Sequence, residues 1–441
     1  MHEWQQDEQC IFHVDVNSAF LSWSALKKLE EDPGSVDLRT IPSAVGGDVQ
    51  TRHGIITAKS IPAKKYGVQT GEPVVKALQK CPSLVLVKSD FATYRKFSHA
   101  LMDILREYTD LVEQVSIDEA YLDMTKSRPL FRNSETPDRP WPLNAAHHIR
   151  QRVFQELHFT VNVGVSINKL LAKMASDFEK PDKVHTLFPE EVPSKLWPLP
   201  MRELHGCGKA TAERLHQMGI ETIGQAAATD LSILQANLGE KAGSYIWRSS
   251  NGMGSVDVHA EHEKAKSYSN EETTAEDVTD ANYKTLGLET VKRLSKKVAS
   301  RLEKGGVYAQ TIGVNVKTED FRRLSRQVTL TAPTRDAKVI RTEAERMMEH
   351  LLFGEEGLFA KGHALRLIGI GCTNLTDGSQ MQMDLFSWTQ TLQEKSQERQ
   401  KREKLDAMMK KVQNRYGSGS ISKGMLAEKG GEDTEKARRD E

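Results

Sequence analysis

Cysteine is scarce in this chain of 441 residues: there are four, widely separated, and none forms a CxxC pair. That scarcity argues against a zinc ribbon and against a disulfide framework. No run of about 18 apolar residues occurs, so we expect no membrane-spanning helix and no membrane partner. The first ten residues are polar and lack the apolar core of a secretion signal, which predicts a cytoplasmic protein.

An excess of either charge is also missing, because Lys plus Arg and Asp plus Glu both number 61. A uniformly basic nucleic-acid coat is therefore excluded, although charge can still be segregated along the chain. Hydrophobic residues make up 38% of the sequence, enough for packed cores. At roughly 150 residues per domain, the length predicts two to four domains.

The sequence changes character along its length. Residues 1–185 alternate apolar strand-like runs with helical patterns, which predicts an α/β order. Residues 201–251 read as short helices joined by Gly-containing turns, and residues 252–266 as a polar linker. Helical patterns at 281–303 and 336–352 alternate with period-2 stretches at 311–316 and 365–370, which predicts a small α+β domain over 267–372.

Three acidic residues stand out. Asp15 ends a predicted buried strand, and Asp118 and Glu119 lie side by side between two short apolar segments. If the two strands are neighbours, three carboxylates converge, and their repulsion favours a divalent cation such as Mg²⁺. Taken singly, Asp15 could equally be a turn or cap residue, and Asp118–Glu119 a solvated surface pair. Spacing alone does not bring them together.

Their surroundings carry a family resemblance. The segments Val14–Phe20 (VDVNSAF), Ser116–Asp123 (SIDEAYLD) and Gly164–Asp177 (GVSINKLLAKMASD), the last followed by Lys180-Pro181, resemble three ordered motifs of the Y-family translesion DNA polymerases. The resemblance runs from about residue 10 to about residue 375. It is closest to the bacterial DNA polymerase IV branch.

The resemblance implies a multidomain α+β and α/β protein shaped like a right hand. It would consist of a ferredoxin-like palm (1–20 and 86–187), small fingers (21–85), a helix-hairpin-helix thumb (188–253), a linker (254–266), an α+β little finger (267–376), and a last segment (377–441) with a clamp-binding peptide, a charged helix and a disordered tail.

The resemblance also implies roles in the palm. Asp15, Asp118, Glu119 and the backbone carbonyl of Val16 would ligate two Mg²⁺ ions, with the three acids catalytic. Phe20 matches the steric gate, an aromatic ring that excludes a ribose 2′-OH and so selects dNTPs. From its pattern alone, Phe20 could instead be a core residue of an amphipathic helix.

For the triphosphate, the resemblance points to Lys64 and Lys180. The family usually has a Tyr and, three residues later, an Arg, where this chain has Ile61 and Lys64. Ile61 cannot hydrogen-bond a phosphate, and Lys64 lacks the bidentate fork of Arg. Instead of contacting the triphosphate, Lys180 could be an ordinary solvated lysine before a proline.

Two regions are expected to bind DNA. Gly206, Gly208 and Lys209 resemble a helix-hairpin-helix, whose turn directs backbone N–H groups at a phosphate without reading bases. Residues 291–350 hold 14 Lys or Arg and 7 Asp or Glu, a local charge of +7 in a neutral chain. From this segment we expect phosphate contacts by Arg322, Arg323 and Arg326; the alternative is an ordinary solvated face.

Near the C-terminus, Gln382-Met383-Asp384-Leu385-Phe386 resembles the clamp-binding peptide of bacterial polymerases, with Gln382, Asp384, Leu385 and Phe386 as its contacts. It lies in a polar stretch, so docking in a pocket of the bacterial sliding clamp is the simplest interpretation. Packing against a predicted helix at 392–416 is the alternative.

The function implied is low-fidelity, template-directed DNA synthesis past damaged bases by a monomer without proofreading, with primer–template DNA and dNTPs as substrates. Two other hypotheses stay open. One is a catalytically idle DNA-binding or accessory protein, which is supported only by the differences from the family pattern at Ile61 and Lys64. The other is a nucleotidyl cyclase, since palm-like folds with paired metals serve both reactions.

Overall fold

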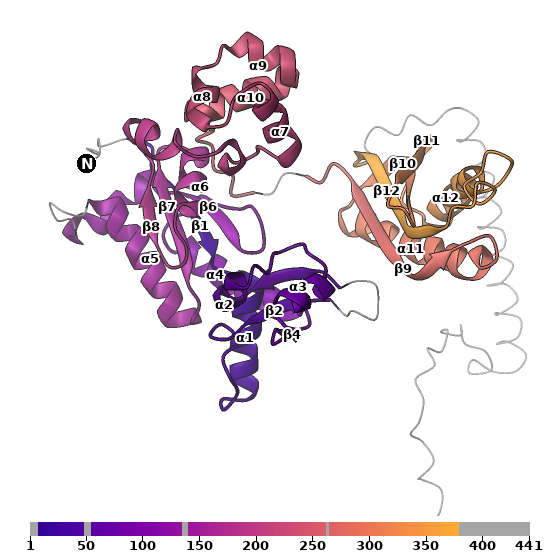
Figure 1. Ribbon diagram of the computed structural model, residues 1–441, viewed down its shortest axis with the longest axis horizontal. Coiled ribbons are helices and arrows are strands. Elements are labelled where there is room, and N and C mark those ends of the chain that lie inside the picture. The colour runs from indigo at the N-terminus through magenta and orange to yellow at the C-terminus, as the bar shows by residue number, and fades with distance from the viewer. Residues whose placement is uncertain (1–7, 48–53, 135–139, 262–263, 379–441) are drawn as a thin grey trace, which may run out of the picture. The chain divides into compact units, whose positions relative to one another are not determined.

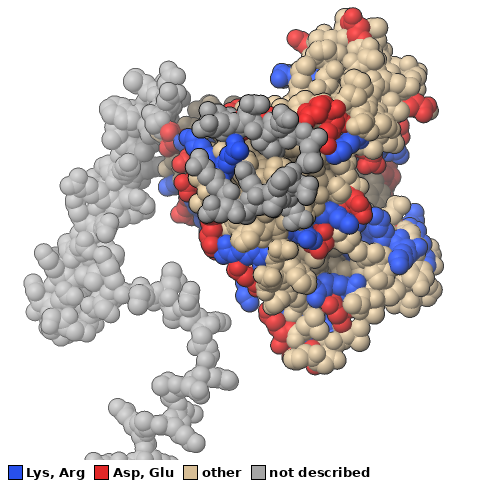
Figure 2. All heavy atoms as spheres, turned by 90° about the vertical axis from the view of Figure 1, so that its left-hand side faces the viewer, with Lys and Arg blue, Asp and Glu red and all other residues tan. Residues whose placement is uncertain are grey.

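The computed structural model describes residues 8–47, 54–134, 140–261 and 264–378. The chain divides into two compact units, one ending at Lys264 and the other beginning at Ala265, and each is described by itself (Figure 1). None of the helices in the described ranges has both the length and the apolar character needed to cross a bilayer. On the face drawn in Figure 2, Lys and Arg side chains are interspersed with Asp and Glu.

The first unit is built around a five-stranded sheet with the order β5-β6-β1-β7-β8. Its strands are β5 (Val112–Gln114), β6 (Glu119–Asp123), β1 (Ile11–Val16), β7 (Val161–Ser166) and β8 (Val184–Thr186). The central strand β1 pairs antiparallel with both β6 and β7. The apolar run at 11–16 therefore forms the buried strand that the sequence predicts.

The two faces of this sheet differ in chemistry. Phe12 and Val14 point into the main core, which α4 (Phe91–Arg106) and α5 (Trp141–Leu157) complete. The opposite face carries polar residues of β1 and is covered by α6 (Lys169–Asp177).

Gly164 of β7 makes the approach of α6 possible. A Cβ at this position would lie 2.0 Å from the carbonyl oxygen of Ala172 and 2.5 Å from the Ser176 nitrogen. Any side chain here would push α6 off the sheet, so the glycine sets the spacing between α6 and the polar face.

The four prolines at 126–145 predict a long loop there, with a helix beginning only at Ala145. This prediction is wrong over most of that range. The chain forms a 3₁₀ helix, Thr125–Ser134, and α5 begins at Trp141, four residues before the expected start. Pro142 lies in the first turn of α5, where a helix has no use for the missing N–H and the fixed φ favours helix entry.

A smaller three-stranded sheet, order β3-β2-β4, packs with short helices. Its elements are β2 (Ser43–Gly46), β3 (Ile56–Lys59), β4 (Val85–Val87), α2 (Ile61–Lys65) and α3 (Val74–Lys80), with α1 (Ala19–Glu31) running from the large sheet to the small one. Strand β2 is antiparallel to β3 and parallel to β4. The result is a small, separate core.

The expected short helices follow as α7 (Lys209–Gln217), α8 (Ile223–Ala228), α9 (Leu231–Leu238) and α10 (Glu240–Ser250), preceded by the short turns Pro189–Glu191, Val192–Leu196 and Met201–Glu203. The next residues, expected as linker, lie against the large sheet. Val258 is buried beside Ile11 and Tyr121, and the backbone N–H of His259 donates to Glu113.

The second unit is the expected α+β arrangement. A four-stranded antiparallel sheet, order β11-β10-β12-β9, is covered by two helices. Its elements are β9 (Tyr268–Val278), the turn Tyr283–Gly287, α11 (Leu288–Lys304), β10 (Tyr308–Thr318), β11 (Arg323–Thr334), α12 (Ala337–Leu352) and β12 (Leu365–Thr376). The predicted helices and period-2 strands are confirmed, with boundaries shifted by a few residues.

Candidate active site

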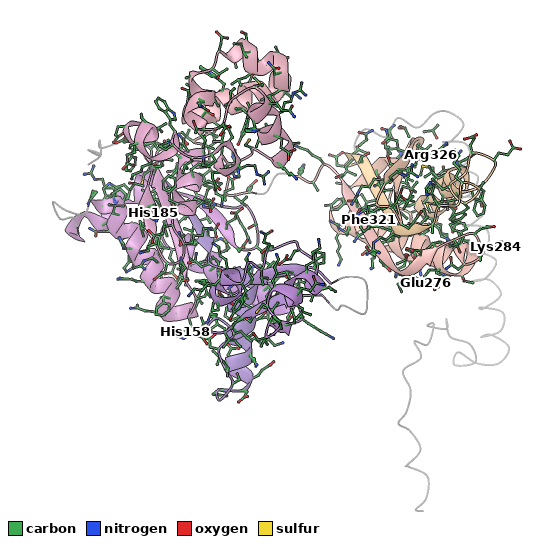
Figure 3. The ribbon with its side chains drawn as sticks, viewed as in Figure 1. His158, His185, Glu276, Lys284, Phe321 and Arg326 are labelled. Carbon is green, nitrogen blue, oxygen red and sulfur yellow. The ribbon has the colours of Figure 1, made fainter. Side chains whose placement is uncertain are left out.

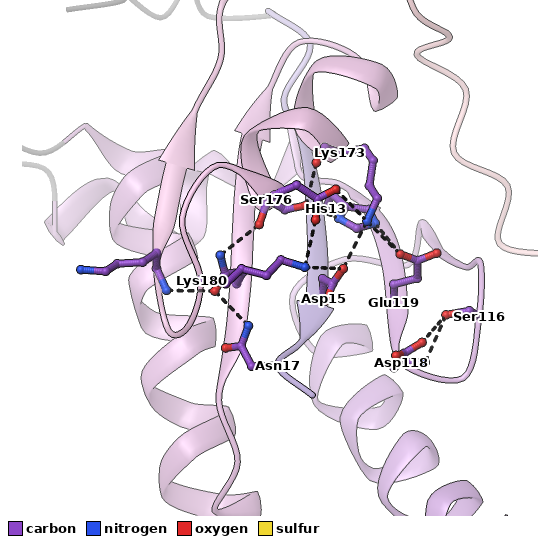
Figure 4. Close-up of polar contacts among 12 residues, drawn as sticks. His13, Asp15, Asn17, Ser116, Asp118, Glu119, Lys173, Ser176 and Lys180 are labelled. Carbon is purple, nitrogen blue, oxygen red and sulfur yellow. Dashed lines mark hydrogen bonds and ion pairs between the residues drawn. The ribbon is translucent and has the colours of Figure 1, made fainter. Parts of the chain in front are cut away.

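Two of the three predicted acids lie next to each other on adjacent strands of the large sheet. Asp15 on β1 is the direct register partner of Glu119 on β6. Asp118 precedes β6, and its carbonyl accepts a hydrogen bond of 3.0 Å from the backbone N–H of Val16. The antiparallel pairing therefore brings together residues more than a hundred positions apart, as Figure 4 shows.

Asp118 lies in an unfavourable place for a carboxylate. Burial, together with the negative charges of Asp15 and Glu119, raises its pKa above the ordinary value. The Ser116 hydroxyl donates to Oδ1 at 2.6 Å and opposes that rise. A carboxylate kept under such repulsion is one that a cation would stabilise.

Two lysines supply positive charge at this site. The Lys173 ammonium lies 3.2 Å from Asp15 Oδ2 and 3.1 Å from Glu119 Oε2. The Lys180 ammonium lies 3.1 Å from Asp15 Oδ2 and 2.9 Å from Asp177. Burial opposes both charges, but the surrounding carboxylates prevail and raise the pKa of each lysine.

Lys173 was not among the predicted site residues. Its signal was present in the third motif, where Lys173 and Asp177 have the i, i+4 spacing of a helical ion pair, observed at 3.3 Å. That spacing did not reveal that the lysine also reaches two strands of the sheet.

Glu119 remains ionised. The neighbouring ring of buried His13, followed by the charge of Lys173, outweighs burial and lowers the pKa of Glu119 to about 2. His13 Nε2 lies 3.4 Å from Glu119 Oε2. The pKa of His13 itself is lowered by its burial.

The three carboxylates share a pattern that fits a metal site. In each, one oxygen is held by the protein: Asp15 Oδ2 by the lysines, Asp118 Oδ1 by Ser116, and Glu119 Oε2 by Lys173 and His13. The second oxygen of each has no partner among the described residues. Hard oxygen donors of this kind suit Mg²⁺.

A cavity of about 460 Å³ opens beside these acids. Asp15, Val16, Asp118 and Phe20 are among the residues that line it, whereas Glu119 is not. Phe20 is partly buried and stacks on Tyr94, with ring centroids 4.6 Å apart and an interplanar angle of 12°. The ring is thus both a core contact and a cavity wall, so the two interpretations of Phe20 are compatible.

Positive charge also lines this cavity. Lys59, Lys64 and Lys180 line it, together with the exposed side chain of Ile61. Burial and the nearby charge of Lys64 lower the pKa of Lys59. Lys59 was not among the residues predicted from the sequence. The available signal was its position as a charged residue at the end of a strand that contains β-branched residues, five positions before Lys64. An anion would stabilise the charged form of Lys59, which burial and the neighbouring positive charge disfavour.

Farther along the first unit, the predicted helix-hairpin-helix glycines lie at the start of α7. Gly206 has φ of 80°, and a Cβ there would lie 2.4 Å from the Tyr245 hydroxyl oxygen. Gly208 is the N-cap of α7, and no side chain caps this end. Lys209 is highly exposed and pairs weakly with Glu213 at 3.6 Å.

In the second unit, Arg323 and Arg326 belong to β11, and Arg322 directly precedes it. Arg322 pairs with Asp320 at 2.9 Å, and Arg323 with Glu271 at 3.2 Å. Arg326 is exposed and has no ion-pair partner among the described residues (Figure 3). Gln382, Asp384, Leu385 and Phe386 lie outside the described residues.

Comparisons with known proteins agree with this fold. Residues 14–177 match the impB/mucB/samB family, residues 265–385 match the C-terminal domain of that family, and residues 202–253 match the thumb domain of DNA polymerase-iota. A DNA polymerase IV from Clostridium acetobutylicum is 38% identical over 95% of this chain and 98% of its own length. DNA polymerase IV 1 of Bacillus subtilis is 37% identical over 95% of this chain and 93% of its own.

Among solved structures, a Y-family DNA polymerase chimera of Dbh and Dpo4 superposes with a TM-score of 0.69 at 25% identity. It covers 83% of this chain and 98% of the chimera. The fold and these similarities define a template-directed nucleotidyltransferase. The chain belongs to the Y-family of DNA polymerases, and it is a DNA-directed DNA polymerase. This family membership sets aside the nucleotidyl cyclase hypothesis.

Proposed function

We propose that this protein extends primers past damaged template bases with low fidelity, by nucleotidyl transfer that depends on two Mg²⁺ ions. The observation that carries the proposal is one cavity lined by both carboxylates, Asp15 and Asp118, and lysines, Lys59, Lys64 and Lys180. A primer 3′-OH attacks the α-phosphate of a dNTP in line, and pyrophosphate leaves.

Asp15, Asp118, Glu119 and the Val16 carbonyl are the groups that would hold the ions. When bound, the ions lower the pKa of the attacking hydroxyl and offset the charge on the leaving pyrophosphate. The free oxygens of the three carboxylates and the raised pKa of Asp118 support this role.

Lys64, Lys180 and Lys59 would bind the triphosphate. In that role they neutralise the phosphate oxygens as point charges rather than as a bidentate guanidinium fork. Phe20 would stack against the sugar and exclude a 2′-OH, so that dNTPs are preferred over rNTPs. Its place in the wall of the cavity supports this assignment.

The low fidelity would follow from a small fingers domain. The three strands of its sheet have only three or four residues each. Ile61 and Tyr66 remain about half exposed there. A surface of this size presses little on a nascent base pair, so damaged bases would be tolerated. We assign no residues to proofreading.

The domain boundaries proposed are those implied by the resemblance: palm, fingers, thumb, linker and little finger. Primer–template DNA would be held through phosphate contacts by the backbone at Gly206 and Gly208, by Lys209, and by Arg322, Arg323 and Arg326. The uncapped start of α7 supports the first of these contacts.

Gln382, Asp384, Leu385 and Phe386 would tether a cytoplasmic, monomeric polymerase to the sliding clamp, raising its effective concentration at the primer end. Replacing Leu385 and Phe386 with Ala should abolish co-elution of the full-length protein with the clamp. Co-elution that persists would assign the clamp contact to another segment.

Primer extension by the purified full-length protein tests the proposed function. Wild type should extend a primer on undamaged and lesion-containing templates only when Mg²⁺ is added, and Asp118→Ala should not. Extension by Asp118→Ala at the wild-type rate would refute the metal-site proposal. A wild-type protein that binds DNA but never extends it would support the idle accessory protein instead.

A further inference from the structure

His13 is a histidine in the interior of the first unit, with no exposed surface. It lies on β1, two residues before Asp15, and faces Gly164 on β7 and Tyr121 on β6 in the register. Its ring packs on Tyr121 with centroids 4.7 Å apart. An apolar side chain would fill this volume without the desolvation that burying two ring nitrogens requires. Packing therefore does not explain why the residue is histidine.

The two ring nitrogens have different partners. Nδ1 lies 2.8 Å from the Ser176 hydroxyl, which is also 2.8 Å from the Lys173 carbonyl. Nε2 has no hydrogen bond of good geometry among the described residues and is aimed at Glu119 Oε2, 3.4 Å away (Figure 4).

The chemistry of these partners fixes the tautomer. An ionised carboxylate only accepts hydrogen bonds, so the nitrogen facing Glu119 must carry the proton. In a neutral ring Nδ1 is then the acceptor, and the Ser176 hydroxyl, which can otherwise donate to the Lys173 carbonyl, is the group that would donate to it. Ser176 can satisfy this arrangement because a hydroxyl both donates and accepts.

The consequence reaches the acidic site through one atom. His13 and Lys173 both act on Glu119 Oε2. The other oxygen, Oε1, has no partner among the described residues. Two partners that hold one oxygen from different directions fix the rotation of the carboxylate. The absence of a side chain at Gly164 lets α6 approach the sheet, which brings Lys173 close to Glu119 and Ser176 close to His13.

We propose that His13 is a positioning residue that orients the Glu119 carboxylate through Nε2–H and thereby sets the affinity of the acidic site for divalent cations. The inference rests on the proposed function of that site. A partner that orients a metal-ligating carboxylate typically changes metal affinity by about 10- to 100-fold.

The test is Mn²⁺ binding to the full-length protein, followed by electron paramagnetic resonance, with Mg²⁺-dependent primer extension alongside. His13→Phe keeps the ring volume and removes both nitrogens. It should raise the dissociation constant for Mn²⁺, and the Mg²⁺ concentration for half-maximal extension, by about tenfold. Affinity for primer–template DNA should not change. His13→Gln, whose amide N–H can reach Glu119, should recover much of the loss.

His148→Phe is the matched control. His148 also has a single hydrogen bond in this unit, 2.7 Å to the Tyr108 hydroxyl, but it does not touch the acidic site. Should His13→Phe fail to fold, as judged by thermal unfolding, Ser176→Ala carries the test and should weaken Mn²⁺ binding by a smaller factor. Wild-type Mn²⁺ affinity in folded His13→Phe, or in Ser176→Ala where that variant carries the test, would overturn the proposal.

The two proposals fail in different ways. If wild type neither binds Mn²⁺ nor extends primers, the proposed function falls. If wild type does both and His13→Phe equals it, only the role of His13 falls.

Discussion

Asp15 on β1 lies directly opposite Glu119 on β6, and the ammonium group of Lys173 bridges their carboxylates at 3.2 and 3.1 Å. The bridge places a protein cation at the point where two negative charges would otherwise repel each other. It also links α6 to two strands of the large sheet. The three side chains that link α6 to the sheet therefore include two of the carboxylates of the proposed metal site.

Lys173→Gln should destabilise the first unit by about 2 kcal/mol, because removing one partner of a largely buried ion pair leaves its carboxylates uncompensated. Added Mg²⁺ should restore more of the melting temperature in this variant than in wild type. Differential scanning calorimetry with and without Mg²⁺ measures both effects. Lys96→Gln is the control, since Lys96 is exposed and its nearest carboxylate is 4.0 Å away. Equal Mg²⁺ responses in Lys173→Gln and wild type would contradict the prediction.

Asp118→Asn should abolish primer extension and yet raise the melting temperature at pH 7.5 by about 2 °C. Burial and the charges of Asp15 and Glu119 raise the folded-state pKa of Asp118, so its ionised form costs stability at neutral pH. That cost fades as pH falls through the folded-state pKa, and the difference between variant and wild type should shrink accordingly. Asp110→Asn, at an exposed position, should change neither property. A lower melting temperature for Asp118→Asn at pH 7.5 would count against the charge repulsion.

Phe20→Ala should increase incorporation of rNTPs relative to dNTPs by about tenfold, a difference of roughly 1.4 kcal/mol in transition-state free energy. The physical reason is the loss of ring volume at the cavity wall. Steady-state kinetics with matched rNTP and dNTP measure the ratio. Phe154→Ala removes a half-exposed ring from α5 and should leave the ratio unchanged. Identical sugar discrimination in Phe20→Ala and wild type would remove the gate assignment.

Lys59→Ala should raise KM for dNTPs by about tenfold with a smaller change in kcat, because a charge-assisted contact to the triphosphate is lost in ground and transition states alike. Single-nucleotide extension kinetics separate the two parameters. Lys65→Ala, which removes an exposed lysine outside the cavity, serves as the comparison. A wild-type KM in Lys59→Ala would restrict the proposed triphosphate contacts to Lys64 and Lys180.

Arg326→Ala should weaken binding of primer–template DNA and reduce by about one the slope of log affinity against log salt concentration, as loss of one phosphate contact requires. Fluorescence anisotropy over a salt series measures the slope. Arg346→Ala removes an arginine of α12 that already pairs with Glu343 at 2.8 Å, and should leave the slope as it is. An unchanged slope for Arg326→Ala would exclude Arg326 from the DNA contact.

Much of the secondary structure could be predicted because local periodicity carries it. The apolar run at 11–16 and the helix at 337–352 form as their patterns indicate. The region 126–145 was misjudged because its prolines read as loop signals. Pro142 instead starts a helix, and the partners that stabilise that helix lie elsewhere in the core.

The residues of the candidate site also fall into those that the sequence could predict and those that it could not. Asp15, Asp118 and Glu119 could be named because each lies in a short motif whose letters carry a recognisable pattern. Lys59, Lys173 and His13 were missed. The local signals of the two lysines, a charge at a strand end and an i, i+4 ion-pair spacing, do not show which distant residues these side chains reach.

By itself, the sequence determined which residue types are available: three acids in two motifs, an aromatic after the first, and basic residues farther along. Only the tertiary structure decided which of them meet. Antiparallel pairing of β1 with β6 brings Asp15 opposite Glu119, and the close contact of α6 with Gly164 brings Lys173 and Ser176 onto the same face. Electrostatic forces act over a few ångströms in space and take no account of separation along the chain, so the chemistry of the site belongs to the fold.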